Sequence, residues 1–146
     1  MNREIAKSDM PDELRIVAGV DGSPGSLRAL DYAADQAAAS GSILQIVTVY
    51  NGLPAYGIVT PIVLDQEGAE SVVQRAMERV RAAHAGIVTK GEIIYGVPGD
   101  VLADVSKGAL ALIVGTRGRS QVVGALLGSV SEHVIHHGHC ATTVVR

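Results

Sequence analysis

The sequence is poor in aromatic residues and in net charge. Its 146 residues include four tyrosines and no tryptophan or phenylalanine, and its formal net charge is −3. Proteins that hold single strands of nucleic acid usually stack the bases on aromatic side chains, for which this chain has little material. It also lacks an overall basic field that would attract nucleic acid or an anionic membrane. We therefore expect no nucleic-acid partner, no membrane association and a core of aliphatic side chains.

Cysteine and long apolar runs are also scarce. Cys140 is the single cysteine and has no partner for an internal disulfide, which fits a reducing compartment. No apolar run approaches the roughly 18 residues that cross a bilayer. The start of the chain mixes charges instead of forming the apolar stretch of a secretory signal. We expect a cytoplasmic protein.

What the sequence does contain is an alternation of apolar segments and helical patterns. Residues 1–13 are expected to be a flexible polar lead-in, and residues 14–146 a single domain. Strands are expected at residues 14–20, 43–50, 86–96, 109–115 and 141–146. Helices are expected at residues 24–40, 66–84, 98–107 and 129–137. This order predicts an α/β fold, Rossmann-like, with one open, mainly parallel, five-stranded sheet and helices on both faces.

Turn residues support this division of the chain. Ser23 followed by Pro24 is typical of a helix start, and Gly41 of a helix end. Residues 51–64, between the second strand and the second helix, are apolar and punctuated by proline and glycine. Because this connection is too long for a turn, we interpret it as a candidate lid or pocket wall.

Two glycine-rich segments follow the first and fourth strands. They read GVDGSPG and GTRGRSQVVGALLGS, and in open α/β sheets ligands bind at the carboxyl ends of strands, where the strand order reverses. Neither segment is a Walker A loop, because no Gly-Lys-Ser/Thr closes it, and neither has the glycine spacing of the dinucleotide fingerprint. Both common nucleotide motifs are therefore absent.

The longer segment nevertheless has the ingredients of an anion site. Gly115 and Gly118 can bring bare main chain close to a ligand and adopt positive φ, exposing consecutive N–H groups. Gly128 and Ser129 open a helix whose first N–H groups have no internal partner and whose dipole favours negative charge. The segment is a candidate phosphate site.

A structural interpretation of the same residues stays open beside the functional one. Arg117 and Arg119 can donate charge-assisted hydrogen bonds to phosphate oxygens. Ser129 and Glu132, however, match a capping box and can simply finish the helix. Asp21, at the end of the first strand, can accept a hydrogen bond from a nucleoside or belong to an ordinary turn.

A cluster of histidines near the C-terminus has a similar ambiguity. Its members are His133, His136, His137, His139 and Cys140. His133 and His137 are four residues apart, a spacing that zinc ligands use, but no acidic ligand or second cysteine accompanies them. Histidines also stabilise a helix C-terminus, and Cys140 has no identifiable activating arrangement. We predict neither a metal site nor a catalytic residue here.

The spacing Gly115-x2-Gly118-x9-Gly128-Ser129 resembles the nucleotide-binding signature of the universal stress protein family. The resemblance extends from IVAGVDGS near the start, through GVPGD, to LLGSVSEHVIHH and the terminal VVR. It implies a five-stranded parallel sheet in the order 3-2-1-4-5. The first and fourth strands would then be neighbours, and the two glycine-rich segments would face one crevice.

The resemblance also implies ATP as the ligand and allows a divalent ion such as Mg²⁺ beside the triphosphate. The implied site consists of the residues that match the family's ligand-binding positions: Asp21, Val49, Gly115, Gly118, Arg119, Gly128, Ser129 and Val130. The residues at the ends of the first two strands would face adenine and ribose. Gly115 would lie near the ribose, and the others would lie along the phosphates.

The last strand of the family pairs with its counterpart in another subunit, and residues 141–146 are short, β-branched and suited to an open sheet edge. We expect a homodimer that acts as an ATP-binding stress-response or signalling module. One alternative is a slow ATPase or phosphotransferase, although few carboxylates are placed to hold metal or a nucleophile. Another is a nucleotide-free dimeric interaction domain. We expect no catalytic residue and at most weak hydrolysis.

Overall fold

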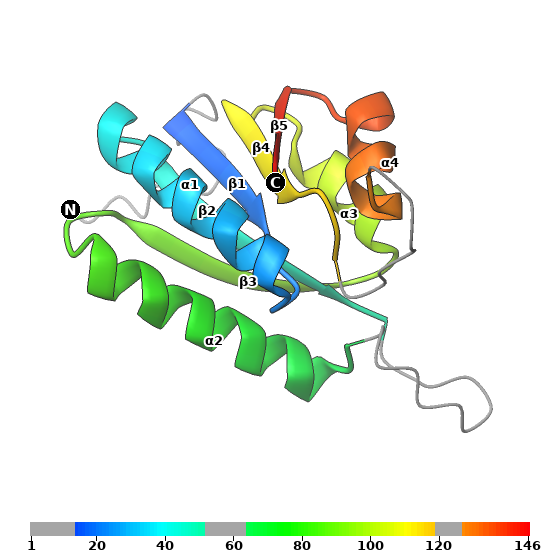
Figure 1. Ribbon diagram of the computed structural model, residues 1–146, viewed down its shortest axis with the longest axis horizontal. Coiled ribbons are helices and arrows are strands. Elements are labelled where there is room, and N and C mark those ends of the chain that lie inside the picture. Colours follow the sequence, from blue (N-terminus) through cyan, green and yellow to red (C-terminus); the bar gives the residue numbers. More distant parts are fainter. Residues whose placement is uncertain (1–13, 52–63, 119–126) are drawn as a thin grey trace, which may run out of the picture.

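The computed structural model describes residues 14–51, 64–118 and 127–146 (Figure 1). The predicted lead-in at residues 1–13, most of the predicted lid and Arg119 lie outside these residues. The described elements, in chain order, are β1 (Arg15–Gly19), α1 (Pro24–Ser40), β2 (Ile43–Tyr50), α2 (Gln66–Ala83), β3 (Thr89–Tyr95), α3 (Pro98–Val105), β4 (Ala111–Gly115), α4 (Ser129–His137) and β5 (Ala141–Val145).

The five strands form one sheet in the order β3-β2-β1-β4-β5. Every neighbouring pair is parallel, so the predicted architecture and strand order are confirmed. β1 lies at the centre, with Val17 opposite Gln45 of β2 and Leu112 of β4. None of the helices in the described ranges combines the length and apolar character needed to cross a bilayer.

The sheet has a helical layer on each face. α1 and α2 lie over one face, and α3 and α4 over the other (Figure 1). Ile16 and Ala18 of β1 belong to the core cluster under α1 and α2, whereas Val17 between them belongs to the cluster under α3 and α4. Because β1 is buried on both sides, its sequence is a continuous apolar run instead of an alternating one.

The first helix has the boundaries that its capping residues predict. Ser23 accepts a hydrogen bond from the Ser26 amide at 3.3 Å, and Pro24 is the first helical residue. The helix ends at Gly41, whose left-handed φ of 69° is a conformation that glycine adopts without steric cost.

Several other boundaries differ from the prediction by one to three residues, among them the start of β3 and the end of α3. β3 begins at Thr89, not at residue 86, because the chain first turns, with the Ile87 amide donating to the His84 carbonyl. α3 ends at Val105, two residues early, because Gly108 adopts a positive φ of 75° in the turn that leads into β4. Both errors lie in turns, where local sequence is least informative.

Candidate functional site

A cleft of about 380 Å³ opens at the carboxyl ends of β1 and β4. These two strands are neighbours, and the chain leaves them toward helices on opposite faces of the sheet. This is the switch point at which open α/β sheets bind ligands. The walls of the cleft come from the ends of β1, β2 and β4 and from the first turns of α1, α3 and α4.

The structure brings together every predicted site residue that it describes. Those that line the cleft are Asp21, Val49, Gly115, Gly118, Gly128, Ser129 and Val130. Arg119 lies outside the described residues. The two glycine-rich segments thus meet at one place, where Asp21, Gly115 and Gly128 also have structural tasks.

Asp21 closes the turn between β1 and α1. Its Oδ1 accepts the Ser23 amide at 2.9 Å, and its own amide donates to Ser26 Oγ at 3.3 Å. The other carboxylate oxygen lies against Gly118, where an added Cβ would come within 2.5 Å of it. Asp21 is therefore both a turn residue and the contact between the two segments.

Gly115 and Gly118 are glycines because of close approach, not because of backbone conformation. A Cβ on Gly115 would lie 2.8 Å from the carbonyl of Gly25 at the start of α1. The described glycines with positive φ lie elsewhere in the chain. The prediction that Gly115 and Gly118 adopt positive φ is wrong, since the missing side chains make room for α1 and for Asp21.

The predicted capping box at the start of α4 is also wrong. Gly128 is the N-cap, without a side-chain cap, and Ser129 is the first helical residue. The Gly128 amide donates to the Thr116 carbonyl at 2.5 Å. Ser131 Oγ lies 3.0 Å from the carbonyl oxygens of both Thr116 and Gly128, to which its hydroxyl can donate. These bonds fasten the chain after β4 to the start of α4.

This arrangement narrows the set of donors that a ligand can use. The Gly128 amide is already bonded within the protein. The amides of Ser129 and Val130 stand at the first two helical positions, where no carbonyl four residues earlier belongs to the helix. Both residues line the cleft, so an anion there would meet these donors and the positive end of the α4 dipole.

The inner wall of the cleft is apolar. Val20, Val47 and Val114, each at most 3% exposed, line it from the ends of three strands, and Leu102 lines it from α3. Asp21 carries the one carboxylate among the described lining residues. A flat apolar group can therefore lie against the strand ends while an anionic group reaches the start of α4.

Asn51 and Leu64, at the two ends of the predicted lid or pocket wall, line the cleft. Lining residues that were not predicted from the sequence include Tyr50, Val97, Pro98, Gly99, Thr116 and His133. The proline at the first position of α3 was a usable signal, because it marks a second helix start beside the sheet edge. Nothing in the sequence indicated that His133 would line the cleft.

His133 also corrects the interpretation of the histidine cluster. Its Nε2 lies 3.0 Å from Asp100 Oδ1 of α3, so an acidic partner does accompany it. His133 lies in the middle of α4 and not at its C-terminus. In the described ranges, no group of three or more His, Cys, Asp and Glu side chains is arranged to hold a metal ion. Burial raises the pKa of the Cys140 thiol, which disfavours the reactive thiolate.

The sequence model of the universal stress protein family matches residues 14–146. The chain belongs to the universal stress protein family. A member from Mycobacterium tuberculosis is 30% identical over 160 residues, which cover 90% of this chain and 48% of the relative. One from Methanocaldococcus jannaschii is 34% identical over 143 residues, covering 90% of this chain and 81% of the relative. The chain spans about half the length of the mycobacterial relatives that it matches.

Solved structures of the family have the same fold. A universal stress protein in complex with cAMP is 32% identical, with a TM-score of 0.70 over 90% of this chain and 96% of that one. A universal stress protein from Archaeoglobus fulgidus has a TM-score of 0.73 over 90% of this chain and 98% of that one. At 23% identity, the latter supports the fold alone.

Proposed function

We propose that this protein binds an adenine nucleotide in the cleft between β1 and β4, with ATP as its ligand in the cell. The observation that carries the proposal is the pairing of an apolar wall with the amide donors of Ser129 and Val130 in one cleft. Its volume is in the range of small-molecule sites. A family member that is 32% identical was solved in complex with cAMP, which supports an adenine nucleotide here.

The shape of the cleft suggests an orientation for the ligand. Adenine would lie against Val20, Val47 and Val49 at the strand ends, with the Asp21 carboxylate near the ribose. The phosphates would extend toward the amides at the start of α4, where the helix dipole favours them. Gly118 leaves space along this path because it has no side chain.

A magnesium ion would be held mainly by the nucleotide. Asp21, the cleft carboxylate, already accepts an amide hydrogen bond through one of its oxygens. Mg²⁺ commonly takes one or two protein carboxylates together with phosphate oxygens and water, so the triphosphate would supply most of its ligands. Fast phosphoryl transfer needs a positioned base and metal ligands as well, so we infer a nucleotide-dependent stress-response or signalling module and not an efficient ATPase.

We also propose that two copies associate through β5. This strand is an edge of the sheet, since only β4 lies beside it in the strand order. Four of its five residues are half-buried in the single chain. An open edge with partly exposed aliphatic side chains favours pairing with a second copy.

The cytoplasm remains the expected location, because the single cysteine fits a reducing compartment.

The function is tested by measuring what the protein carries and what it binds. Protein purified without added nucleotide is denatured, and the released material is identified by chromatography and ultraviolet absorbance. Calorimetric titrations with ATP, AMP, cAMP and guanosine triphosphate then give the affinities. We expect adenine nucleotides to bind and the guanosine nucleotide to bind more weakly. Absence of any adenine-nucleotide binding would overturn the proposal, and rapid release of phosphate from ATP would favour the ATPase alternative.

A further inference from the structure

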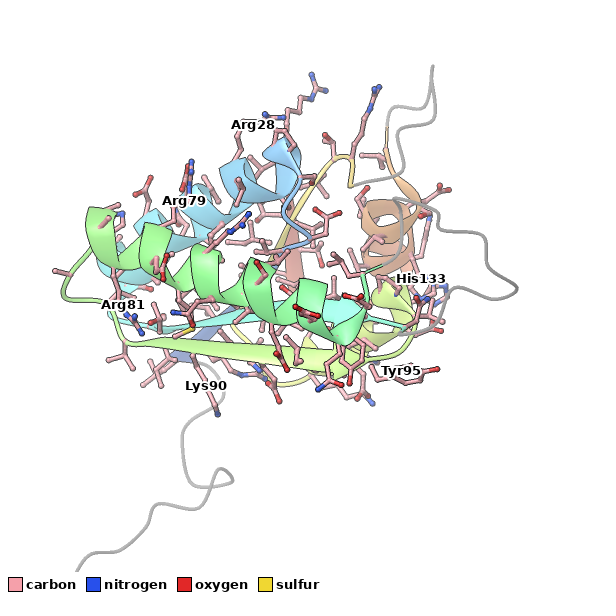
Figure 2. All side chains as sticks on the ribbon, turned by 90° about the horizontal axis from the view of Figure 1, so that it is seen from below. Arg28, Arg79, Arg81, Lys90, Tyr95 and His133 are labelled. Carbon is pink, nitrogen blue, oxygen red and sulfur yellow. The ribbon has the colours of Figure 1, made fainter. Side chains whose placement is uncertain are left out.

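His133 is a cleft residue with a function that the proposed nucleotide site leaves open. Its imidazole lines the cleft from α4, and its side chain is 34% exposed. Figure 2 shows the labelled side chain at the end of the molecule where α3 and α4 lie together. Among the described lining residues it is the one imidazole.

The position of this ring is fixed from the α3 side. Its Nε2 lies 3.0 Å from Asp100 Oδ1, an arrangement that orients the ring. A Cβ added to Gly99 would lie 2.8 to 3.0 Å from three carbon atoms of His133, so the glycine leaves just enough space for the imidazole to pack there. The ring also lies 4.4 Å, centroid to centroid, from that of His137.

The imidazole lies close to where a ligand phosphate would bind. His133 follows Ser129 by four residues, which corresponds to about 6 Å along the helix axis. Side chains of an α-helix lean toward its N-terminus. The His133 side chain therefore leans back toward the turn that carries the Ser129 and Val130 amides, on the wall that faces the cleft.

We infer that His133 is a further ligand-contacting residue of the cleft, oriented by Asp100, and that an anionic nucleotide binds with uptake of a proton at this imidazole. The inference rests on the proposed nucleotide function. A ligand anion that binds beside the ring favours the protonated, cationic ring over the neutral one. Affinity then rises as pH falls through the range in which imidazoles titrate.

Other charged and titratable groups surround the ring. Asp100 on α3 and His137 on α4 lie directly against it. Across the cleft, Asp21 and Arg117 carry opposite charges. Binding adds the charge of the ligand to these groups, so the test compares ligands of different charge.

The experiment titrates the full chain with cAMP and with adenosine between about pH 5.5 and pH 8. A phosphodiester lacks the second ionisation near pH 6 that a phosphate monoester has, so any proton taken up from the buffer with cAMP is bound by a group of the protein. Calorimetry in buffers of different ionisation enthalpy counts these protons. We expect cAMP affinity to rise by roughly threefold to fivefold toward the lower pH, and adenosine affinity to change little.

Three variants test whether the His133 imidazole causes the pH dependence of cAMP affinity. His133→Gln should weaken cAMP binding at low pH and remove both the rise in affinity and the proton uptake. Asp100→Asn keeps the imidazole but removes the carboxylate that orients it, and should reduce the rise in affinity. His136→Gln, on the same helix but not in the cleft lining, should behave as wild type.

The outcomes separate this inference from the function on which it rests. Wild-type protein that binds cAMP with the same pH dependence as His133→Gln would overturn the assignment of His133 and leave nucleotide binding intact. If His133→Gln does not fold, an unchanged pH profile in Asp100→Asn would count against the inference in the same way. Wild-type protein that binds neither cAMP nor any other adenine nucleotide would overturn the proposed function itself.

Discussion

The two helical layers of this protein differ in length, contacts and chemistry. α1 and α2 have 17 and 18 residues and cover their face of the sheet with an aliphatic cluster, whereas α3 and α4 have 8 and 9 residues. The long helices are joined to each other by the Arg79–Asp31 ion pair and by the contact between the His84 ring and the Asp35 carboxylate. The short helices carry part of the cleft lining, including His133 of α4 (Figure 2). One layer mainly stabilises the sheet, and the other mainly builds the site.

Removing a large side chain from the long-helix layer should have the largest effect on stability. Leu30 of α1 is fully buried, so Leu30→Ala should lower the free energy of unfolding by about 3 kcal/mol, through lost burial and a cavity. Urea denaturation measures this loss. Nucleotide affinity of the remaining folded protein should stay within about twofold of wild type; a large loss of affinity would contradict the division between the layers.

A side chain added at Gly118, after β4, should have the opposite effect. It should reduce ligand affinity strongly and stability only a little. Gly118→Val would place a branched side chain against Asp21 and along the proposed phosphate path. We expect a loss of ATP affinity of at least about tenfold, or about 1.4 kcal/mol, with a smaller change in the free energy of unfolding. Gly86→Ala is the control, because a Cβ there meets nothing within 4 Å. Wild-type affinity in Gly118→Val would remove Gly118 from the proposed site.

Substitutions of the two serines in the first turn of α4 should affect different properties, stability for Ser131 and ligand affinity for Ser129. Ser131 is buried and its hydroxyl is bonded to main-chain carbonyls, so Ser131→Ala should cost about 1 kcal/mol of stability. Ser129 is exposed and does not cap the helix. Ser129→Ala should therefore leave stability within about 0.5 kcal/mol and affect only ligand affinity. Thermal unfolding and calorimetric titration of both variants measure these effects.

The smallest effect concerns pH and the long-helix layer. Hydrogen bonding to the Arg79 guanidinium lowers the pKa of Asp31. A lowered pKa in the folded state means that this carboxylate adds stability above its unfolded pKa, and that the contribution is lost as pH falls through the folded value. Because the pair is exposed, Asp31→Asn should cost only about 0.5 kcal/mol near neutral pH. The difference from wild type should shrink in strongly acidic solution, and a constant difference would contradict this assignment.

The fold and the place of the site could be predicted because both follow from patterns along the chain. The apolar runs around Val17 and Leu112 predict buried parallel strands, and parallel strands place the segments that follow them at one edge. The resemblance to the family supplied the strand order, which periodicity alone does not give.

The errors at the site have one physical cause, which is that contacts between distant segments decide local details. Gly115 lacks a side chain because Gly25, ninety residues earlier, packs against it. The start of α4 is set by the Thr116 carbonyl and not by the serine that follows Gly128. His133 became a cleft residue because α3 brings Asp100 and Gly99 beside it. None of these neighbours can be identified from sequence spacing.

The hydrogen bond from the Gly128 amide to the Thr116 carbonyl has a consequence for how this protein can vary. It joins the chain after β4 to the start of α4 through main-chain groups alone. A side-chain substitution at Thr116 would keep this bond, so the position of α4 relative to β4 should be insensitive to which residue stands there.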